Sequence, residues 1–207
     1  MRHNISRATI AQLDDTGKLL SGEKGLSTDG LYVIDHNEEG FATLNITGIE
    51  AAGVAVWLNG QLKHNSYGKS QPVIAMTGAV DFEMKQKIKG FVKTKNGGWM
   101  RKLPKPHIAM IAESEGWDGE VYYECFANLD FIEEASNNST DNNNEVDSMD
   151  TLNATANAPL SKDVFTDGIT QEPYMIAMSD DDFDKDKLWG EVFGGYTAPA
   201  SGSTQAG

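Results

Sequence analysis

The chain has 207 residues, which is enough for one domain with a substantial hydrophobic core. Its formal net charge of −14 repels phosphate groups and argues against non-specific nucleic-acid binding. The chain has one cysteine, which excludes an internal disulfide, and no run approaches the ~20 apolar residues of a membrane span. Because the first residues also lack the apolar core of a signal peptide, we expect a soluble protein made in a reducing cytoplasm.

The first half of the chain is predicted to consist mainly of β-strands. Ala8–Leu13 is apolar and partly β-branched, and the turn residues Asp14–Gly17 follow it. Further strands are expected at 31–35 and 41–49. The second of these alternates between two faces, as a half-buried strand does. One face would carry Phe41, Thr43, Asn45 and Thr47, and the other Ala42, Leu44, Ile46 and Gly48.

A β-hairpin is predicted at 54–65, where Asn59-Gly60 separates two apolar-alternating runs. Asn and Gly tolerate the positive φ angles of a type I′ turn, whose twist matches that of the paired strands. A strand at 72–80 comes next. A short helix is then expected after Asp81, which can cap it, and Gly90 can end it in the left-handed conformation.

The second half is predicted to contain the central strands, at 107–114 and 120–132. Cys125 lies among aromatic residues in the second strand and is interpreted as a packed thiol. A polar, acidic arm at about 133–150 follows. A last strand is expected at 174–178 and a closing helix within 181–195. The tail at 197–207 has no apolar pattern and is predicted to be disordered.

No pattern of catalytic or metal-binding residues emerges from the sequence. It contains no HExxH, GxSxG, P-loop or GxGxxG motif, so we expect neither an enzyme nor a cofactor. Asp180, Asp182, Asp184 and Glu191 do have the spacing of an EF-hand loop. However, Lys185 stands where the sharp turn needs glycine, and the following residues have a helical apolar stripe. We therefore interpret this segment as the N-terminus of a helix, with its acids facing the helix dipole.

Charge is distributed very unevenly along the chain. Residues 1–107 carry 14 basic and 10 acidic side chains, whereas 108–207 carry 3 basic and 21 acidic ones. The basic stretch 85–105 holds eight Lys or Arg, and 132–152 holds six acids, neither with a nearby opposite charge in the sequence. Such a pattern favours an interaction protein whose copies attract one another. The alternative is that both stretches are solvated surfaces.

Five segments, in their order along the chain, resemble the major tail proteins of long, non-contractile-tailed phages and prophages of Gram-positive bacteria. These segments are GLSTDGLYVID, ATLNITGIEAAGVAVWLNGQL, DFEMKQKIKGFVKTKNGGWM, HIAMIAESEGWDGEVYYECFANLDF and WGEVFGGY. The similarity runs from about Arg7 to Tyr196. It differs where the family returns from its long arm with a β-branched and aromatic strand, because this chain has DTLNATANAP there. The resemblance leaves the length and pairing of that strand open.

The resemblance implies a mainly β, sandwich- or barrel-like fold with one or two short helices, forming a single tail-tube domain over 1–196. It implies a virion protein, assembled in the host cytoplasm, whose hexameric rings stack into a tube through which DNA leaves. Other copies of the chain, a tape-measure protein and tail-end proteins are the implied partners, with no membrane, catalytic residue, cofactor or metal. A head decoration or adhesion protein is the alternative.

The acidic arm has two hypothetical roles in such a tube. It could gain order on a neighbouring ring, where its acids would meet the basic stretch of another copy. The residues expected at this contact are Lys93, Lys95, Lys102, Glu133, Glu134 and Glu145. Acidic side chains lining the channel would also repel phosphate, so that DNA slides without sticking.

Overall fold

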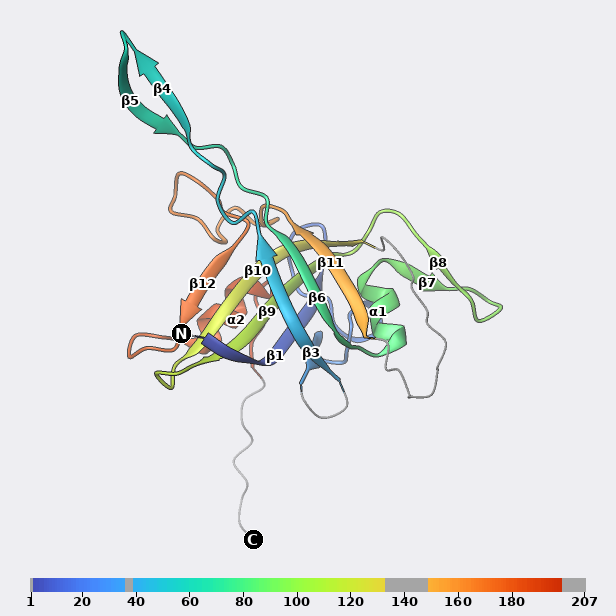
Figure 1. Ribbon diagram of the computed structural model, residues 1–207. Helices are drawn as coiled ribbons and strands as arrows, with labels where there is room; N and C mark the ends of the chain where they lie inside the picture. Colours follow the sequence, from blue (N-terminus) through green and yellow to red (C-terminus); the bar gives the residue numbers. More distant parts are fainter. Residues whose placement is uncertain (1, 36–38, 133–148, 199–207) are drawn as a thin grey trace, which may run out of the picture.

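The computed structural model describes residues 2–35, 39–132 and 149–198 (Figure 1). Within them, eight strands form one antiparallel sheet in the order β2–β1–β9–β10–β11–β6–β3, with β12 also paired to β10. Their bounds are Arg2–Leu13 (β1), Leu31–Ile34 (β2), Gly40–Thr47 (β3), Val73–Ala79 (β6), His107–Gly116 (β9), Val121–Ile132 (β10), Asp150–Ala156 (β11) and Met175–Met178 (β12). The mainly β, sandwich-like fold expected from the sequence is confirmed.

The sheet bends so that its two ends share one hydrophobic core. Ile10 of β1 and Ile74 of β6, which lie far apart in the strand order, both belong to this inner cluster and are fully buried. Helix α1 (Phe82–Ile88) packs on the same cluster through Ile88 and Met84. The large fully buried side chains of β10, such as Phe126, fill its centre.

A second core lies on the opposite face of β1, β9 and β10, under helix α2 (Lys185–Val192). Alternation along β9 explains why both faces are buried, because Met110 points to the inner cluster and Ile111 to the outer one. Trp189 of α2 packs edge-on against Tyr123, with ring centroids 5.6 Å apart. The near-continuous apolar runs of β9 and β10 are therefore those of strands covered on both sides.

Both helices begin and end where their local chemistry predicts. Asp81 accepts a hydrogen bond from the Met84 N–H at 2.9 Å, and Gly90 adopts a φ of 82° just after α1. Asp184 caps α2 in the same way, through the Lys187 N–H. The helices expected after Asp81 and within 181–195 are confirmed.

One strand face was wrongly predicted, and the structure gives the pairing of one strand that the resemblance left open. A register shift between Phe41 and Thr43 turns Phe41 to the core side of β3, beside Leu44 and Ile46, instead of the outward side. A bulge of this kind is set by pairing with β6, which a strict alternation of residues does not reveal. The segment after the arm forms β11, which pairs with both β10 and β6.

Two hairpins extend from the body (Figure 1). Strands β4 (Val54–Leu58) and β5 (Gln61–Ser66) form one, and β7 (Phe91–Lys93) and β8 (Trp99–Arg101) form the other. A short 3-10 helix at Gly22–Lys24 lies in the connection between β1 and β2. Most of the expected arm, at 133–148, lies outside the described residues, as do 199–207 of the expected disordered tail.

Ending the chain after Tyr196 is expected to leave folding unchanged, together with the self-assembly that the resemblance implies. Tyr196 packs against the outer core, so the truncation keeps the last described contact with that cluster. The removed residues carry no apolar pattern that would build a core. Circular dichroism melting and electron microscopy of the truncated protein check this, and loss of soluble protein would contradict it.

Candidate assembly surfaces

The hairpin β4–β5 contains the turn that the sequence predicts. Asn59 and Gly60 have φ angles of 51° and 75°, which are the positive values that a type I′ turn requires. Among the residues that the structure describes, the two strands pair only with each other, as a separate two-stranded sheet. Because an isolated pair of strands is marginally stable in water, this hairpin is suited to being covered by another protein surface.

Large apolar side chains are exposed on both faces of this hairpin. Val54 is 68% exposed on one face, while Trp57 and Leu62, paired across the strands on the other face, are 61% and 52% exposed. Leu58 next to the turn is also exposed. Fully burying one such side chain is worth roughly 1.5–3 kcal/mol. The hairpin therefore has the composition of an interface core, enriched in aromatic and aliphatic residues.

The basic stretch forms a second surface, built from α1 and the β7–β8 hairpin. Lys93 lies 4.0 Å from the Glu83 carboxylate and 6.0 Å from the Trp99 ring centroid. Lys95, in the β7–β8 turn, and Lys102, after β8, are both exposed. The structure thus places the three lysines expected at an intersubunit contact on one lobe. Glu133, Glu134 and Glu145, expected opposite them, lie outside the described residues.

The expectation that the basic stretch has no opposite charge nearby is wrong. Lys85 forms an ion pair with Asp150 at the start of β11, and Lys105 donates a hydrogen bond to the Phe131 carbonyl near the end of β10. The two described ends that flank 133–148 are therefore both held by lysines of the same chain. These partners are 65 and 26 residues apart in the sequence, so sequence neighbours do not reveal them.

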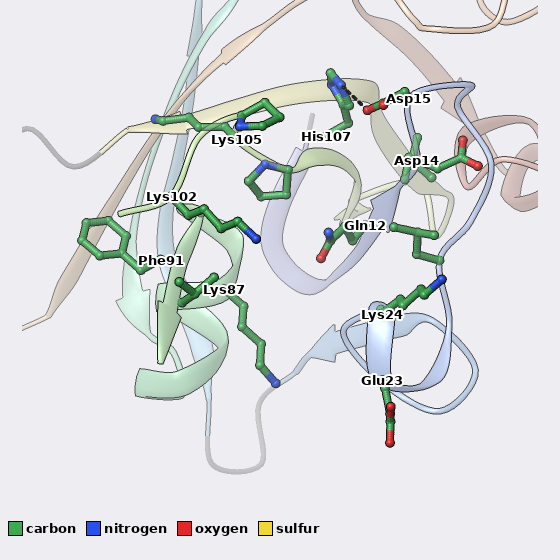
Figure 2. Close-up of a pocket in the computed structure, with 17 residues that line it drawn as sticks. Gln12, Asp14, Asp15, Glu23, Lys24, Lys87, Phe91, Lys102, Lys105 and His107 are labelled. Atoms are coloured by element: carbon green, nitrogen blue, oxygen red, sulfur yellow. Dashed lines mark ion pairs between the residues drawn. The ribbon is translucent and has the colours of Figure 1, made fainter. Parts of the chain in front are cut away.

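A cleft of about 500 Å³ lies between this lobe and the connection from β1 to β2 (Figure 2). In Figure 2 the Lys102 side chain extends toward the middle of the cleft, and His107 lies 3.7 Å from Asp15 at its rim. Lys24, from the opposite wall, adds a cation that the sequence reasoning missed because it is distant from 85–105. The lobe wall carries Lys87, Lys102 and Lys105, and the opposite wall carries Asp14, Asp15, Glu23 and Lys24, so this cleft is a polar contact surface.

A third surface is the outward face of β11, β6 and β3, which we call the neutral face. Side chains lie on it in three cross-strand rows. They are Thr43–Thr77–Thr151, Asn45–Ala75–Asn153 and Thr47–Val73–Thr155. The Thr43 and Thr77 hydroxyls are 2.7 Å apart and share a hydrogen bond. None of these nine positions carries a charge, although 23% of the chain is charged.

Of the residues with EF-hand spacing, Asp184 caps helix α2 and Glu191 lies within it, while Asp180 and Asp182 lie just before the helix. Asp184 accepts the Lys187 N–H at 3.1 Å, and the Glu191 carboxylate accepts the Phe165 N–H at 3.1 Å. Glu191 is within α2, so its position is fixed by helix geometry and not by an open loop. Among the residues that the structure describes, no group of three His, Cys, Asp or Glu side chains is arranged to hold a metal ion.

Calcium is expected not to bind tightly at 180–191, because the oxygens of Asp184 and Glu191 already accept backbone hydrogen bonds. Isothermal titration calorimetry with calcium measures this directly. One-to-one binding with micromolar affinity would contradict the assignment of α2 as a helix in solution.

Burial raises the pKa of the Cys125 thiol well above its usual range. The side chain is fully buried in the outer core, and its sulfur lies 3.7 Å from the Tyr123 carbonyl oxygen. A neutral, inaccessible thiol is a poor nucleophile, which confirms the interpretation of Cys125 as a packed residue.

No helix in the described part of the chain has the length and apolar character needed to cross a membrane.

Comparison with known proteins gives one result. Neither a curated protein nor a solved structure matches the chain. The family model for phage tail tube protein, however, matches residues 1–201, which is nearly the whole sequence. The chain therefore belongs to the phage tail tube protein family, a family of structural virion proteins.

Proposed function

We propose that this protein is the repeating subunit of the tail tube of a long, non-contractile-tailed phage. Copies of the chain form hexameric rings, the rings stack, and the enclosed channel carries DNA into the host. The observation that carries this proposal is the β4–β5 hairpin. Its large apolar side chains are exposed and lie outside both core clusters of their own chain, namely Val54, Trp57, Leu58 and Leu62. Membership of the tail tube family supports burial of these side chains on another copy.

The hairpin acts as an arm that a neighbouring subunit covers. Its turn and cross-strand pairing pre-organise Trp57 and Leu62, which lowers the entropy lost on binding. A large aromatic side chain surrounded by aliphatic ones is the usual composition of an interface hot spot. In a closed ring or stack, each copy gives one hairpin and receives another, so a single contact type is repeated throughout the tube.

A tape-measure protein inside the channel and proteins at the tube ends are the further partners in this proposal. Assembly takes place in the host cytoplasm, and the finished protein resides in the virion tail. DNA passes without specific binding. The tube is a scaffold and a conduit, and no catalysis is part of its role.

Negative-stain electron microscopy of the concentrated, purified protein tests the proposal. Hollow tubes or stacked rings of regular diameter are expected. A head decoration or adhesion protein would instead give compact, monodisperse particles at every concentration, and that result would overturn the tube assignment.

The basic lobe and the acidic arm are proposed to meet during assembly. Lys93, Lys95 and Lys102 supply the cations, and Glu133, Glu134 and Glu145 supply the anions. Exposed pairs contribute only ~0.2–1 kcal/mol each, but a tube repeats every contact. Within one chain, the ion pair Lys85–Asp150 and the hydrogen bond from Lys105 hold the described residues on either side of 133–148 against this lobe, so the two charged segments lie on the same part of each copy.

Reversing Lys93, Lys95 and Lys102 to Glu is expected to slow tube formation while the free subunit stays folded. Reversing Glu133, Glu134 and Glu145 to Lys in the same chain should restore part of the rate. Turbidity and electron microscopy at low salt measure the effect, and ~1 M salt should reduce the difference by shortening the Debye length to ~3 Å. Wild-type assembly by the triple Glu variant at low salt would show that the two segments do not meet.

A further inference from the structure

A second pocket, of about 450 Å³, lies at the start of β1 and is separate from the cleft beside the basic lobe. It is lined by residues 4–7 of β1, by Asp35 just after β2, and by Glu113 and Glu115 of β9. Three carboxylates and the Arg7 guanidinium therefore surround it. Because its lining carries an excess of negative charge, we call it the acidic pocket.

The backbone of β1 is irregular beside this pocket. Its pairing with β9 shifts register between His3 and Ile5, and again between Ile5 and Arg7. Asn4 has a φ of 54°, in the left-handed region that residues other than glycine seldom adopt. Bulges of this kind bend a strand and redirect its side chains. The acidic pocket thus lies where β1 departs from a regular strand ladder.

One carboxylate oxygen of the pocket lining is buried without a donor. Glu113 is only 7% exposed, yet no hydrogen bond from the described part of the chain reaches its Oε1 atom. The Lys185 ammonium lies 4.0 Å away, beyond hydrogen-bond distance, and is also placed over the Trp189 ring at 4.5 Å from its centroid. Buried polar atoms of native proteins almost always have a partner, so this oxygen indicates that a donor enters from outside the chain.

We infer that the acidic pocket accepts a lysine ammonium from a second copy of this chain, and that Lys95 of the β7–β8 hairpin supplies it. The inference rests on the proposed function and refines it. Lys95 then binds in the acidic pocket of one neighbour, while Lys93 and Lys102 remain for the contact with the acidic arm. The pocket contact joins two different surfaces, because the donor and the acceptor come from distant parts of the chain.

The chemistry of the pocket fits a lysine at a hairpin tip. An ammonium group is compact, has three N–H donors and sits on a flexible stem, so it can enter a pocket that three carboxylates surround. Lys95 is exposed in a turn that the Thr94 N–H closes by a 2.7 Å hydrogen bond to the Gly98 carbonyl. Lys93 already has an ion pair and a ring contact within its own lobe, and Lys102 extends into the cleft.

The two surfaces lie on opposite sides of the subunit. In Figure 1 the start of β1 is at the left, beside the N-terminus, and the β7–β8 hairpin projects at the right. A head-to-tail ring needs two different complementary surfaces on each copy, so that every subunit gives one contact and receives the other. The β4–β5 hairpin extends in a third direction, from the top of the body, and serves a different contact.

Disulfide crosslinking between copies tests the inference. Lys95→Cys and Glu115→Cys place one thiol at the hairpin tip and one at the exposed edge of the pocket, and the buried Cys125 gives little background reaction. The two variants, mixed and oxidised, should form a disulfide dimer that contains one chain of each. Lys95→Cys mixed with Ile169→Cys is the matched control, because Ile169 is 91% exposed and lies outside the pocket.

A mixed-dimer yield no higher than in the control would overturn the inference. A higher yield when Lys95→Cys is mixed with Glu133→Cys would also overturn it, because Lys95 would then contact the acidic arm. A chain that carries both Lys95→Cys and Glu115→Cys should give crosslinked species up to a closed ring. Crosslinked species that stop at two copies, or absence of tubes from wild type, would keep the pocket contact and overturn the ring or tube of the proposed function.

The charge pairing has its own test. Lys95→Gln and Glu113→Gln should each raise the concentration needed for assembly by about tenfold, and the double variant should be no worse than either one. The free Glu113→Gln subunit should melt no lower than wild type, because the change removes a buried charge that lacks a donor. Lys162→Gln is the matched control, since it removes an exposed lysine outside the basic lobe, and it should assemble like wild type.

Three outcomes would contradict the pairing. Wild-type assembly by Lys95→Gln would show that this lysine is not needed, and additive effects in the double variant would show that the two side chains do not meet. A lower melting temperature of the free Glu113→Gln subunit would assign Glu113 to the stability of its own chain, through Lys185.

Discussion

Replacing both Trp57 and Leu62 by serine is expected to abolish tube formation at concentrations where wild type polymerises fully. The two side chains are paired across β4 and β5 and are more than half exposed in the single chain. Central aromatic residues of an interface contribute about 2 kcal/mol or more each, and a loss of about 2 kcal/mol raises the concentration needed for assembly about 30-fold. Sedimentation of polymer from a dilution series measures that concentration.

The free subunit of this double variant should melt at the same temperature as wild type, because neither side chain belongs to a core cluster. Ile169→Ser is the matched control, since it also removes an exposed aliphatic side chain, but outside the hairpin. It should assemble like wild type. Full polymerisation of the Trp57→Ser, Leu62→Ser protein would exclude the hairpin as the main contact between copies.

Phe126→Ala is expected to cost about 3–5 kcal/mol of folding free energy, because removal of a fully buried ring leaves a cavity. Phe126 has no solvent exposure and lies in the inner cluster, with its ring centroid 5.3 Å from that of Tyr174. Domains of ordinary stability have about 5–15 kcal/mol in total, so much of this subunit would be unfolded at modest denaturant concentrations. Urea unfolding followed by circular dichroism measures the difference.

Phe82→Ala is the matched control for that experiment. It makes the same chemical change at the first residue of α1, where the ring is 58% exposed and contacts Trp99 edge-on. Its effect on the free energy of unfolding should be within about 1 kcal/mol. Equal losses in the two variants would show that the inner cluster does not have the packing described here.

Local chemistry explains which parts of this fold could be predicted from the sequence. The Asn59-Gly60 turn and the Asp81 cap depend on residues within a few positions of one another, and both are present in the structure. The face of β3 that carries Phe41 was mispredicted, because the bulge between Phe41 and Thr43 depends on pairing with β6. Strand β11 has small and polar residues with modest strand preference, and pairing with a strand on each side stabilises it.

The assembly surfaces could be predicted only in part for the same reason. A run of basic residues is visible in any sequence, and Lys93, Lys95 and Lys102 do share one lobe. Their intrachain neighbourhood, such as the pair Lys85–Asp150, depends on the tertiary fold. The neutral face spans three strands from distant parts of the chain, so its rows exist only after the strands have paired.

The strand order of the main sheet has a consequence for how the protein is made. β1 pairs with β9, about a hundred residues later in the chain, so the central sheet cannot form until most of the polypeptide has been synthesised. The β4–β5 hairpin needs only its own residues, and hairpins form in ~1–10 μs, while domains rich in long-range strand pairs take milliseconds to seconds. The hairpin that we propose as the contact between copies, although marginally stable by itself, can therefore form long before the body of the nascent subunit. Crowded polysomes expose such arms to one another, and the time that a chain spends half-folded sets how often the wrong contacts form.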